Sequence, residues 1–391
     1  MFDVIVVGLG PAGSTAAYDL AKRGYKVLGL DKETFPRYKS CGGCISTKIE
    51  RILDFPIDEA IDDTVYGATF TYKSERKIDI ISDRSVGHNV MRDKFDYFLV
   101  KKAIEAGAQV LEGRRVTNVT DSGDLVTVKC ANGESYSAKF LVGADGAAGF
   151  VGRSHFGLDP KQVAVSVTAE IPYDRESAGC KGRLFIDFGS VPYGYAWVFP
   201  KEKFLSAGIA GDAAKVGGRI KGYFDEFLRS HPSVKGLSAD DKMGWTVPIY
   251  YTGAPSSVKG RVALAGDTGH LVDPFLGEGI YFAIRTAKGA AGVIADCLEN
   301  GTADLTPYQA WLEKEIVPEF RSAEKLSDLV YAHPRLWYSI VEKDPELMLR
   351  YYDVIRGIES CDSFYSWVYG KVRSKPWKML RRWVESRFLP S

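Results

Sequence analysis

The sequence has little cysteine, little histidine and no long uninterrupted apolar run. Its 6 cysteines are scattered along 391 residues, with only Cys41 and Cys44 close together, which argues against the disulfide framework of a secreted domain. The 5 histidines are not spaced as metal ligands, so we expect no metal site. Every apolar stretch of membrane-spanning length contains charges or turn formers, so we expect no transmembrane helix. The net charge of +1 gives no reason to expect a nucleic-acid partner.

The two ends of the sequence bear on its location. Residues 1–8 run directly into an apolar segment without the pattern of a secretion signal, so we expect a cytoplasmic protein. Residues 371–388 interleave Lys and Arg with Trp and Leu, which is typical of helices that lie on an anionic membrane surface. An ordinary terminal helix with a solvated basic face has the same pattern. Peripheral membrane contact through this segment is therefore one of two interpretations that the sequence leaves open.

Hydrophobic periodicity divides the chain into two kinds of segment. Residues 2–8, 26–31 and 261–266 are short apolar runs typical of buried parallel strands, and helical patterns follow the first and the last of them. Alternating polarity between these pieces predicts antiparallel strands. We therefore predict an α/β fold in which a Rossmann-type domain is interrupted by an antiparallel-sheet substrate domain and followed by a helical C-terminal tail. The predicted domains are 1–65, 92–158 and 256–305 for the Rossmann-type domain, 66–91 and 159–255 for the antiparallel-sheet domain, and 306–391 for the helical region.

A glycine-rich motif, GLGPAG, occupies residues 8–13 between a predicted strand and a predicted helix. Gly8 permits a tight turn, Gly10 lets the backbone approach a pyrophosphate, and Gly13 allows close packing of helix and strand. The helix N-terminus then offers N–H donors to the phosphates. Asp31 ends the next strand, where a carboxylate accepts hydrogen bonds from ribose hydroxyls. The predicted dinucleotide contacts are Gly8, Gly10, Pro11, Ala12, Gly13, Asp31 and Lys32.

Two later motifs identify the dinucleotide. Asp145-Gly146 ends one predicted strand, and Gly266-Asp267 ends another, ahead of a long helix. In this order the motifs resemble those of the para-hydroxybenzoate hydroxylase-like FAD-dependent oxidoreductase superfamily, which implies FAD as the cofactor. By that resemblance, Asp267 contacts the ribityl chain and the backbone of residues 277–279 approaches the flavin ring; the alternative for Asp267 is a helix-capping carboxylate. The resemblance adds these FAD contacts: Arg92, Asp145, Gly146, Gly266, Asp267, Pro274, Gly277, Glu278, Gly279 and Ile280.

The electron donor to the flavin has no motif of its own. No second strand–GxGxxG–helix unit follows the first, so we expect no dedicated NADPH domain. The expected donor is therefore NADPH that visits the flavin transiently, or a reduced electron-carrier protein.

Residues 193–201, YGYAWVFPK, are predicted to form a strand with aromatic rings at alternate positions. Alternation places Tyr195, Trp197 and Phe199 on one face, which is either an aromatic core face or the wall of an apolar pocket. The segment resembles the YxWxFP signature of geranylgeranyl reductases, whose strand lines the prenyl pocket. An isoprenoid tail has no polar handle, so apolar contact must hold it, at about 25 cal/mol per Å² buried. By this resemblance the substrate pocket comprises Tyr193, Tyr195, Trp197, Phe199 and Pro200, with Tyr195 and Trp197 in the catalytic set.

The loop after the second strand contains the sequence Cys41-Gly42-Gly43-Cys44. Cys41-Gly42 matches a Cys-Gly pair of geranylgeranyl reductases, which implies catalytic and FAD contacts for both residues. Cys44 departs from that family, where many members have glycine. Three interpretations remain: Cys41 donates a proton to, or gates, the substrate double bond; Cys41 and Cys44 are a redox pair that exchanges electrons with the flavin; or both are small residues in a loop near FAD. A flavin disulfide reductase would need the second dinucleotide domain that we do not find.

The resemblance implies a geranylgeranyl reductase-like enzyme, which saturates C=C bonds of a prenyl chain on a lipid, quinone or chlorophyll-type precursor by hydride transfer from reduced FAD. The rival on the same fold is an aromatic monooxygenase or a halogenase, and the fold alone does not decide between them. Flavin halogenases have a Trp-x-Trp-x-Ile-Pro motif where this chain has YAWVFP. A rival of another class is a non-catalytic protein that binds FAD or a lipid.

Overall fold

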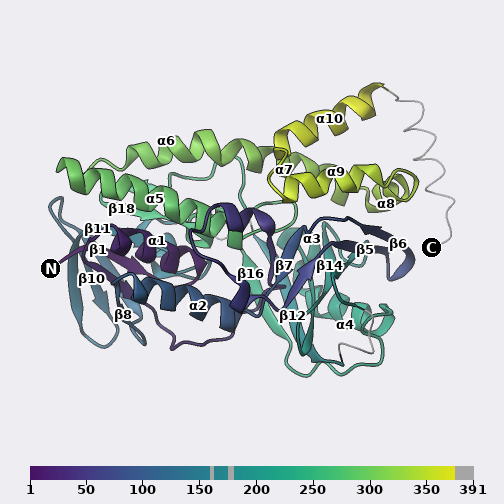
Figure 1. Cartoon of the computed structure of the whole chain (residues 1–391), viewed down its shortest axis with the longest axis horizontal. Helices are drawn as coiled ribbons and strands as arrows, with labels where there is room; N and C mark the ends of the chain where they lie inside the picture. The colour runs from purple at the N-terminus through teal and green to yellow at the C-terminus, as the bar shows by residue number, and fades with distance from the viewer. Residues whose placement is uncertain (159–162, 175–179, 375–391) are drawn as a thin grey trace. The chain divides into compact units, whose positions relative to one another are not determined.

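The structure is a computed structural model, and it describes residues 1–158, 163–174 and 180–374 (Figure 1). The chain forms two compact units, each built from three separate stretches. Unit 1 comprises residues 1–39, 92–163 and 246–321, and unit 2 comprises residues 40–91, 164–245 and 322–391. The predicted domain boundaries place 40–65 with the Rossmann-type domain and separate 306–391 from both; those boundaries stay a prediction.

Unit 1 is built on a mixed sheet whose central strands are parallel, as the apolar runs predict. β1 lies between β2 and β11, and β8 and β18 extend the parallel pairing on either side. β17 pairs antiparallel with β18, and the β9–β10 hairpin joins β11. The strands are β1 (Phe2–Val7), β2 (Val27–Leu30), β8 (Gln109–Leu111), β9 (Val116–Asp121), β10 (Val126–Cys130), β11 (Ser135–Gly143), β17 (Val258–Lys259) and β18 (Val262–Leu264).

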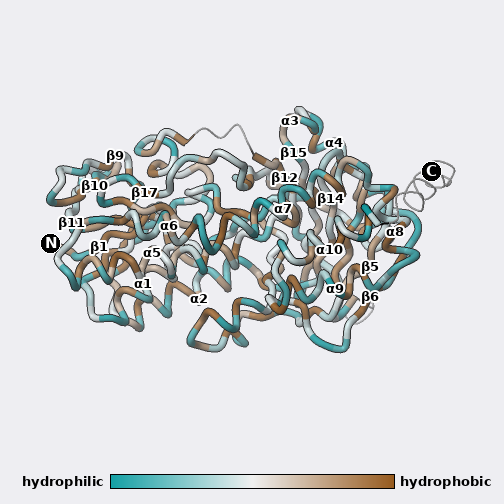
Figure 2. The backbone as a smooth tube through the Cα atoms, turned by 90° about the horizontal axis from the view of Figure 1, so that it is seen from above, coloured by the Kyte–Doolittle hydropathy of each residue, from teal (hydrophilic) through white to brown (hydrophobic). Residues whose placement is uncertain are grey.

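Both faces of residues 4–7 of β1 are buried against different layers, which explains why these four residues are all hydrophobic; Figure 2 colours the backbone by hydropathy. Ile5 and Val7 join the side chains of the β9–β10 hairpin in one core. Val6 points to the opposite face, where it lies against helix α1 at Gly13. α1 contacts both α2 and α5, and the three helices lie side by side in Figure 1. Their bounds are α1 (Pro11–Lys22), α2 (Arg92–Glu105) and α5 (Ile280–Asn300).

Further helices follow α5 at the end of unit 1. α6 (Thr306–Glu315) places the fully buried Tyr308 against the sheet, where its hydroxyl donates to the carbonyl oxygen of Leu264 at 2.9 Å. α7 (Val317–Tyr331) then begins, and Phe320 packs on Tyr250 and Phe282 with ring centroids 5.3 and 4.6 Å apart. β18 ends at Leu264, two residues before the end of the predicted strand 261–266, and a single 3₁₀ turn, Gly266–Gly269, follows it.

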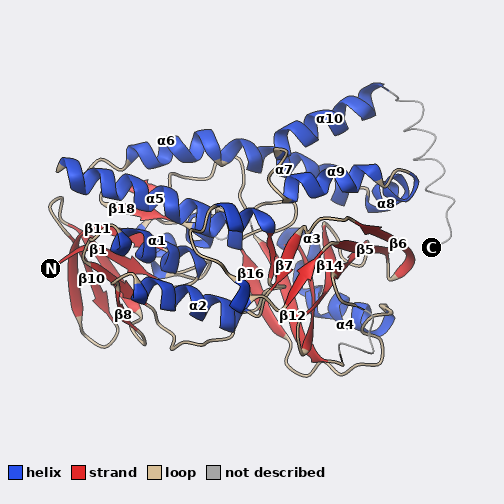
Figure 3. Cartoon of the chain, in the orientation of Figure 1, coloured by secondary structure: helices blue, strands red, loops and turns tan. Residues whose placement is uncertain are grey.

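Unit 2 is built on a second sheet with the strand order β16-β12-β15-β14-β13-β5-β6 (Figure 3). β12, β15, β14 and β13 pair antiparallel in that order, as do β5 and β6. β13 runs parallel to β5, a difference from the purely antiparallel sheet that alternation predicts. Sequence alternation reports which face a residue occupies but not the direction of its neighbour strand. The strands are β5 (Gly67–Tyr72), β6 (Glu75–Ile81), β12 (Ala164–Pro172), β13 (Arg183–Phe188), β14 (Gly194–Pro200), β15 (Phe204–Asp212) and β16 (Met243–Val247).

One face of this second sheet is covered by helix α4 (Ile220–Ser230). Ala196 and Val198 of β14 point into that core, together with Phe224 and Phe227 of the helix. A small separate sheet in the order β3-β7-β4 is not predicted from the sequence, and β5 and β6 of the larger sheet lie between its strands β4 and β7 in the chain. Its strands are β3 (Cys44–Ser46), β4 (Asp63–Val65) and β7 (Gly87–Asn89).

The core beneath α4 contains His231, whose side chain is 1% exposed. Its Nδ1 accepts a hydrogen bond from the backbone N–H of Ser233 at 3.3 Å. Burial lowers the pKa of His231 from 6.5 to about 4, because protonation would place a charge among the rings of Phe185 and Phe227.

The low pKa of His231 predicts acid destabilisation. The folded state resists protonation that the unfolded chain accepts, so this stability is complete above about pH 6.5 and falls as the pH decreases towards 4. The loss should reach about 3 kcal/mol. Urea unfolding from pH 7 to pH 4 should show a smaller decrease for His231→Asn than for the wild type. His333→Asn, at an exposed position, should retain the full decrease; equal slopes for all three proteins would contradict this prediction.

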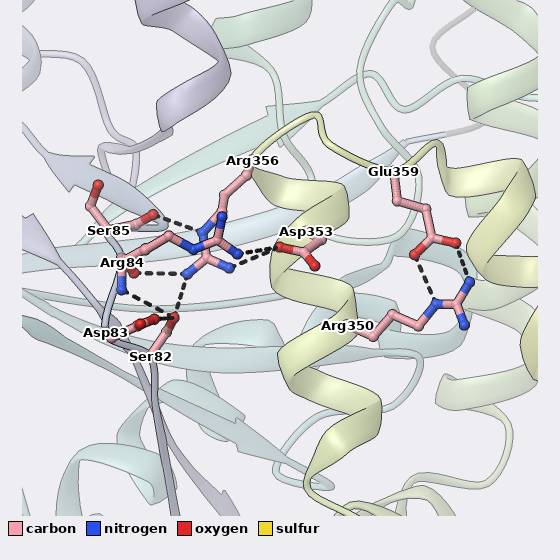
Figure 4. Close-up of polar contacts among 8 residues, drawn as sticks. All are labelled: Ser82, Asp83, Arg84, Ser85, Arg350, Asp353, Arg356 and Glu359. Carbon is pink, nitrogen blue, oxygen red and sulfur yellow. Dashed lines mark hydrogen bonds and ion pairs between the residues drawn. The ribbon is translucent and has the colours of Figure 1, made fainter.

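Helices make up the last described part of unit 2, residues 334–374, as the helical pattern predicts. α8 contacts β5 and β13, and α9 contacts β6, so they lie at the β6 edge of the second sheet. α8 (Pro334–Lys343), α9 (Glu346–Ile355) and α10 (Cys361–Ser374) follow α7 in the chain. Arg350 of α9 binds Glu359 through Nε and Nη2 at 2.8 and 2.6 Å, which closes the turn before α10 (Figure 4).

Arg356, just after α9, ties these helices to the strand connection after β6 (Figure 4). Its Nη2 donates to Ser82 Oγ at 2.6 Å and to the Arg84 carbonyl at 2.7 Å, and its Nε donates to the Ser85 carbonyl at 3.0 Å. Asp353 pairs with its Nη1 at 3.1 Å. Because the guanidinium is buried and bonded on all three nitrogens, it fixes the connection that leads into β7.

The described helices and the basic segment 371–388 bear on the two expectations about a membrane. Among the described residues, no helix has both the length and the apolarity needed to cross a bilayer. Of the basic segment 371–388, residues 371–374 end α10, and the rest lies outside the described residues. Peripheral membrane contact through this segment therefore stays a prediction.

Candidate functional site

The glycine-rich motifs all follow the carboxyl ends of parallel strands in unit 1. The registers align Val7 with Leu30 and with Gly143, and Gly143 with Leu264. The segments that follow these strands therefore all lie at one edge of the sheet: residues 8–13, Asp31, Asp145-Gly146 and Gly266-Asp267. In open α/β sheets this edge is where nucleotides bind.

The first loop has the shape that a pyrophosphate requires. Gly8 has a φ of +89°, and a Cβ on it would overlap the backbone of Ala144. A Cβ on Gly13 would overlap the carbonyl oxygen of Gly8, so only glycine lets α1 approach β1 this closely. Gly10 is the N-cap of α1 and no side chain caps the helix. The first-turn N–H groups and the positive end of the helix dipole are thus available to an anion.

Asp31 braces this loop from the neighbouring strand. Its Oδ2 accepts from the backbone N–H of Leu9 at 2.6 Å, and its Oδ1 accepts from that of Glu33 at 2.9 Å. Burial raises the pKa of Asp31, and these two backbone hydrogen bonds act against that shift. Each carboxylate oxygen retains a second lone pair, so the ribose contact stays a prediction. Lys32 is exposed beside Glu33.

A buried charge cluster beside the loop was not predicted as a unit. Asp96 is fully buried and accepts from Arg92 Nε and Nη2 at 2.8 and 2.9 Å, and it pairs with Arg37 Nη1 at 3.0 Å. Arg37 Nη2 lies 3.6 Å from the position of a Cβ on Gly10. Arg37 is the cation of this cluster that lies nearest the phosphate loop, and the direct contact of Arg92 with FAD stays a prediction. The available sequence signal was the spacing of Arg92 and Asp96, four apart on one helix face.

The two later motifs contact each other and the first loop. The backbone N–H of Gly146 donates to Thr268 Oγ1 at 2.7 Å, and a Cβ on Gly266 would lie 3.2 Å from that of Ala12. Asp145 Oδ2 accepts from the N–H of Val151 at 2.9 Å, and burial raises the pKa of this carboxyl group. Its Oδ1 is buried and has no hydrogen-bond partner among the described residues.

Asp267 does not cap the 3₁₀ turn in which it lies, so the helix-capping alternative is not what this structure shows. Its side chain is half-buried, and its Oδ1 lies 3.5 Å from the position of a Cβ on Gly279. Gly279 is the N-cap of α5, which no side chain caps. A half-buried carboxylate beside a helix N-terminus that no described side chain caps fits the hydroxyl-bearing chain and the polar ring edge of FAD.

The loop that leads to α5 is held by a residue that sequence reasoning did not single out. Asp273 Oδ1 accepts from the backbone N–H of Phe275 at 3.0 Å and of Leu276 at 2.6 Å. Its carbonyl accepts from Gly277, which has a φ of +68° and is exposed. The remaining predicted contacts in this loop are the buried Pro274 and Ile280 and the half-buried Glu278.

Unit 2 contains the predicted aromatic strand. The rings of Tyr195, Trp197 and Phe199 contact one another in sequence, with centroids 5.8 and 6.1 Å apart. They share the face of β14 opposite to the core beneath α4, which confirms the predicted alternation. Tyr195 also stacks on Tyr331 of α7 at 6.5 Å. Tyr193 is exposed before the strand, with the Lys215 ammonium 5.0 Å from its ring centroid.

The structure brings the cysteine loop onto this aromatic face within unit 2. A Cβ on Gly42 would lie 2.8 Å from the Phe199 ring and 3.0 Å from Trp197 Nε1. Trp197 Nε1 is buried and has no hydrogen-bond partner among the described residues. Cys41 is half-buried with a free thiol, and Cys44 is likewise half-buried and reduced. Pro200 ends the strand, and its carbonyl accepts from Asn89 Nδ2 at 2.9 Å.

These features define an FAD-dependent oxidoreductase: the FAD binding domain family matches residues 1–169. A geranylgeranyl diphosphate reductase of Rhodobacter capsulatus is 30% identical to the chain over 84% of it and 84% of that protein. A digeranylgeranylglycerophospholipid reductase of Thermoplasma acidophilum is 31% identical, over 81% of this chain and 83% of that protein. The chain belongs to the geranylgeranyl reductase family.

Solved structures agree with this assignment. The crystal structure of a geranylgeranyl bacteriochlorophyll reductase-like protein from Thermoplasma acidophilum matches with a TM-score of 0.75 and 26% identity, over 84% of this chain and 87% of that chain. A flavin-dependent brominase matches with a TM-score of 0.72 at 20% identity, over 95% and 99% of the two chains. At that identity the second likeness shows the shared fold alone.

Proposed function

We propose that the enzyme saturates C=C bonds in a prenyl chain of a lipid, with the substrate tail held on the aromatic face of unit 2. The observation that supports this most strongly is the contact of the Cys41-Gly42 loop with Trp197 and Phe199. It combines an extended apolar surface with a half-buried thiol, which suits a tail without polar groups and a reaction that needs one proton. The digeranylgeranylglycerophospholipid reductases among the relatives make a membrane lipid the favoured substrate class.

FAD that is bound to unit 1 and reduced by two electrons from the donor would supply the hydride that an alkene accepts on one carbon. The residues of the chain have the other tasks. The loops at the carboxyl edge of the sheet hold the cofactor, and the rings of β14 orient the alkene and exclude water. Cys41 is the proposed donor of the proton to the second alkene carbon. Its direct contact with FAD, and that of Gly42, stays a prediction.

The proposal is tested by single-turnover reoxidation. The purified holoprotein is reduced with dithionite without oxygen and mixed with vesicles that contain a geranylgeranyl diether lipid. The flavin absorbance should return at least about tenfold faster than with the saturated lipid of the same headgroup. Mass spectrometry should find two added hydrogens for each bond reduced.

Failure of every prenyl lipid to reoxidise the flavin would overturn the proposal. Hydroxylation of a ring substrate by reduced protein and oxygen would establish the monooxygenase alternative instead. Multiple turnovers with the same vesicles compare the donors, because without dithionite either NADPH or a reduced carrier protein must reduce the flavin in each cycle. The donor and the peripheral membrane contact both remain predictions.

A further inference from the structure

Lys201, the residue after the aromatic strand, is a lysine with 1% exposure. Buried lysines are rare because an ammonium loses its hydration, and burial accordingly lowers the pKa of Lys201. The ionisable groups whose charges oppose that shift are Cys44, Glu170, Cys41 and Asp62. Lys201 therefore lies close to both cysteines of the loop and to two carboxyl groups.

The ammonium of Lys201 binds the backbone of the cysteine loop. Its Nζ donates to the carbonyl of Gly42 at 2.6 Å and to that of Gly43 at 2.9 Å. Bonds from a charged donor to two consecutive carbonyls fix the orientation of the peptide between them. Gly43 has a φ of +66°, and a Cβ there would overlap the carbonyl of Val90 and lie 2.9 Å from Lys201 Nζ, so the loop closes directly on the lysine.

The same peptide unit reaches the Cys41 thiol. The carbonyl of the Gly42–Gly43 peptide accepts from Lys201, and its N–H faces Cys41 Sγ at 3.4 Å. A hydrogen bond at one end of a peptide polarises the group at the other end, so the ammonium and the sulfur are joined through one amide. Ser206 Oγ adds a long contact of 3.5 Å to the Cys41 carbonyl.

Stability alone does not account for a charge at this position. Replacing a buried ion by an apolar side chain of similar volume is often neutral or stabilising. An aliphatic residue would also continue the apolar character of the strand that precedes it. The gain from a lysine here is the defined geometry of the loop.

We propose that Lys201 is a positioning residue that acts through the Gly42–Gly43 peptide to hold the Cys41 thiol in place for alkene reduction. The proposal rests on the proposed function of Cys41. It assigns no contact with substrate or flavin to Lys201.

The test is a double-mutant cycle with Lys201→Met, which keeps the length of the stem and removes the donor. In the wild-type background, kcat for the prenyl lipid should fall about tenfold, while KM and FAD content stay the same. In the Cys41→Ser background the same change should have almost no further effect on kcat, because its target is absent. Lys203→Met, on the exposed turn two residues away, is the matched control and should leave kcat unchanged.

A second readout does not need turnover. Hydrogen exchange of the peptide that covers Cys41 to Cys44 should become faster in Lys201→Met and stay at the wild-type rate in Lys203→Met. If the wild type reduces no prenyl lipid, the proposed function fails. Separately, an unchanged exchange rate in Lys201→Met would show that Lys201 does not hold the loop.

Two results would overturn the positioning role itself. One is an unchanged kcat in Lys201→Met. The other is an equal loss of kcat with and without Cys41, which would show that Lys201 acts on stability or elsewhere. If Lys201→Met does not fold, Lys201→Gln retains a short donor, and the same cycle with that variant decides the question.

Discussion

Gly13→Ala is expected to produce a protein that binds FAD about 10- to 100-fold more weakly than the wild type. The added Cβ would overlap the carbonyl oxygen of Gly8 and lie 2.8 Å from its carbon and 3.1 Å from Val6 Cγ1. The start of α1 must therefore move away from β1. Overpacking of this kind typically costs about 1–3 kcal/mol, and here the displaced atoms are the ones that are predicted to bind the pyrophosphate.

Gly292 provides the matched control for Gly13→Ala. Gly292 lies within α5 of the same unit, and a Cβ on it would meet nothing within 4 Å. Gly292→Ala should leave FAD binding unchanged and stabilise the helix by about 0.5–1 kcal/mol. FAD titration of the two apoproteins, followed by flavin fluorescence, measures both affinities. Equal affinities would show that close packing at Gly13 is not what shapes the phosphate loop.

The fold and the cofactor loops could be predicted because their signals are local. Residues 8–13 combine a strand, a turn and a helix in one short segment, and each glycine has a separate steric reason to be there. The order of the later motifs then placed Asp145 and Asp267 at the same edge. Alternation in β14 likewise assigned Tyr195, Trp197 and Phe199 to one face without knowledge of its neighbours.

The features that the sequence did not predict depend on contacts between distant segments. Arg37, in the loop after β2, lies near the phosphate loop and forms an ion pair with Asp96 of α2. Lys201 is buried through its contacts with the cysteine loop, whose Gly42 and Gly43 carbonyls accept hydrogen bonds from it. Periodicity does not specify the direction of a neighbouring strand, so it could not predict the parallel pairing of β5 with β13. The strands of the small sheet are only three residues long, which is too short for periodicity to identify them.

Cys41→Ser is expected to lower kcat for a prenyl lipid about 100-fold and to leave FAD content unchanged. A hydroxyl is a far weaker acid than a thiol, and a positioned general acid contributes about 10²- to 10⁴-fold to the rate. Serine is close to cysteine in size, so the packing of Gly42 on Trp197 and Phe199 should persist. Rapid mixing of dithionite-reduced protein with lipid vesicles measures the hydride-transfer step directly.

Cys44→Ser, in the same loop, separates the three roles that the two cysteines allow. If Cys41 donates the proton, only Cys41→Ser is slow, because the Cys44 thiol then has no part in the reaction. If the two thiols are a redox pair, either substitution interrupts electron exchange, and both variants should lose activity to the same degree. If both cysteines are merely small loop residues, neither variant should be slow, and the proton must come from another donor. Neither cysteine forms a disulfide in the structure, which agrees with all three outcomes, so the ratio of the two rates is what decides between them.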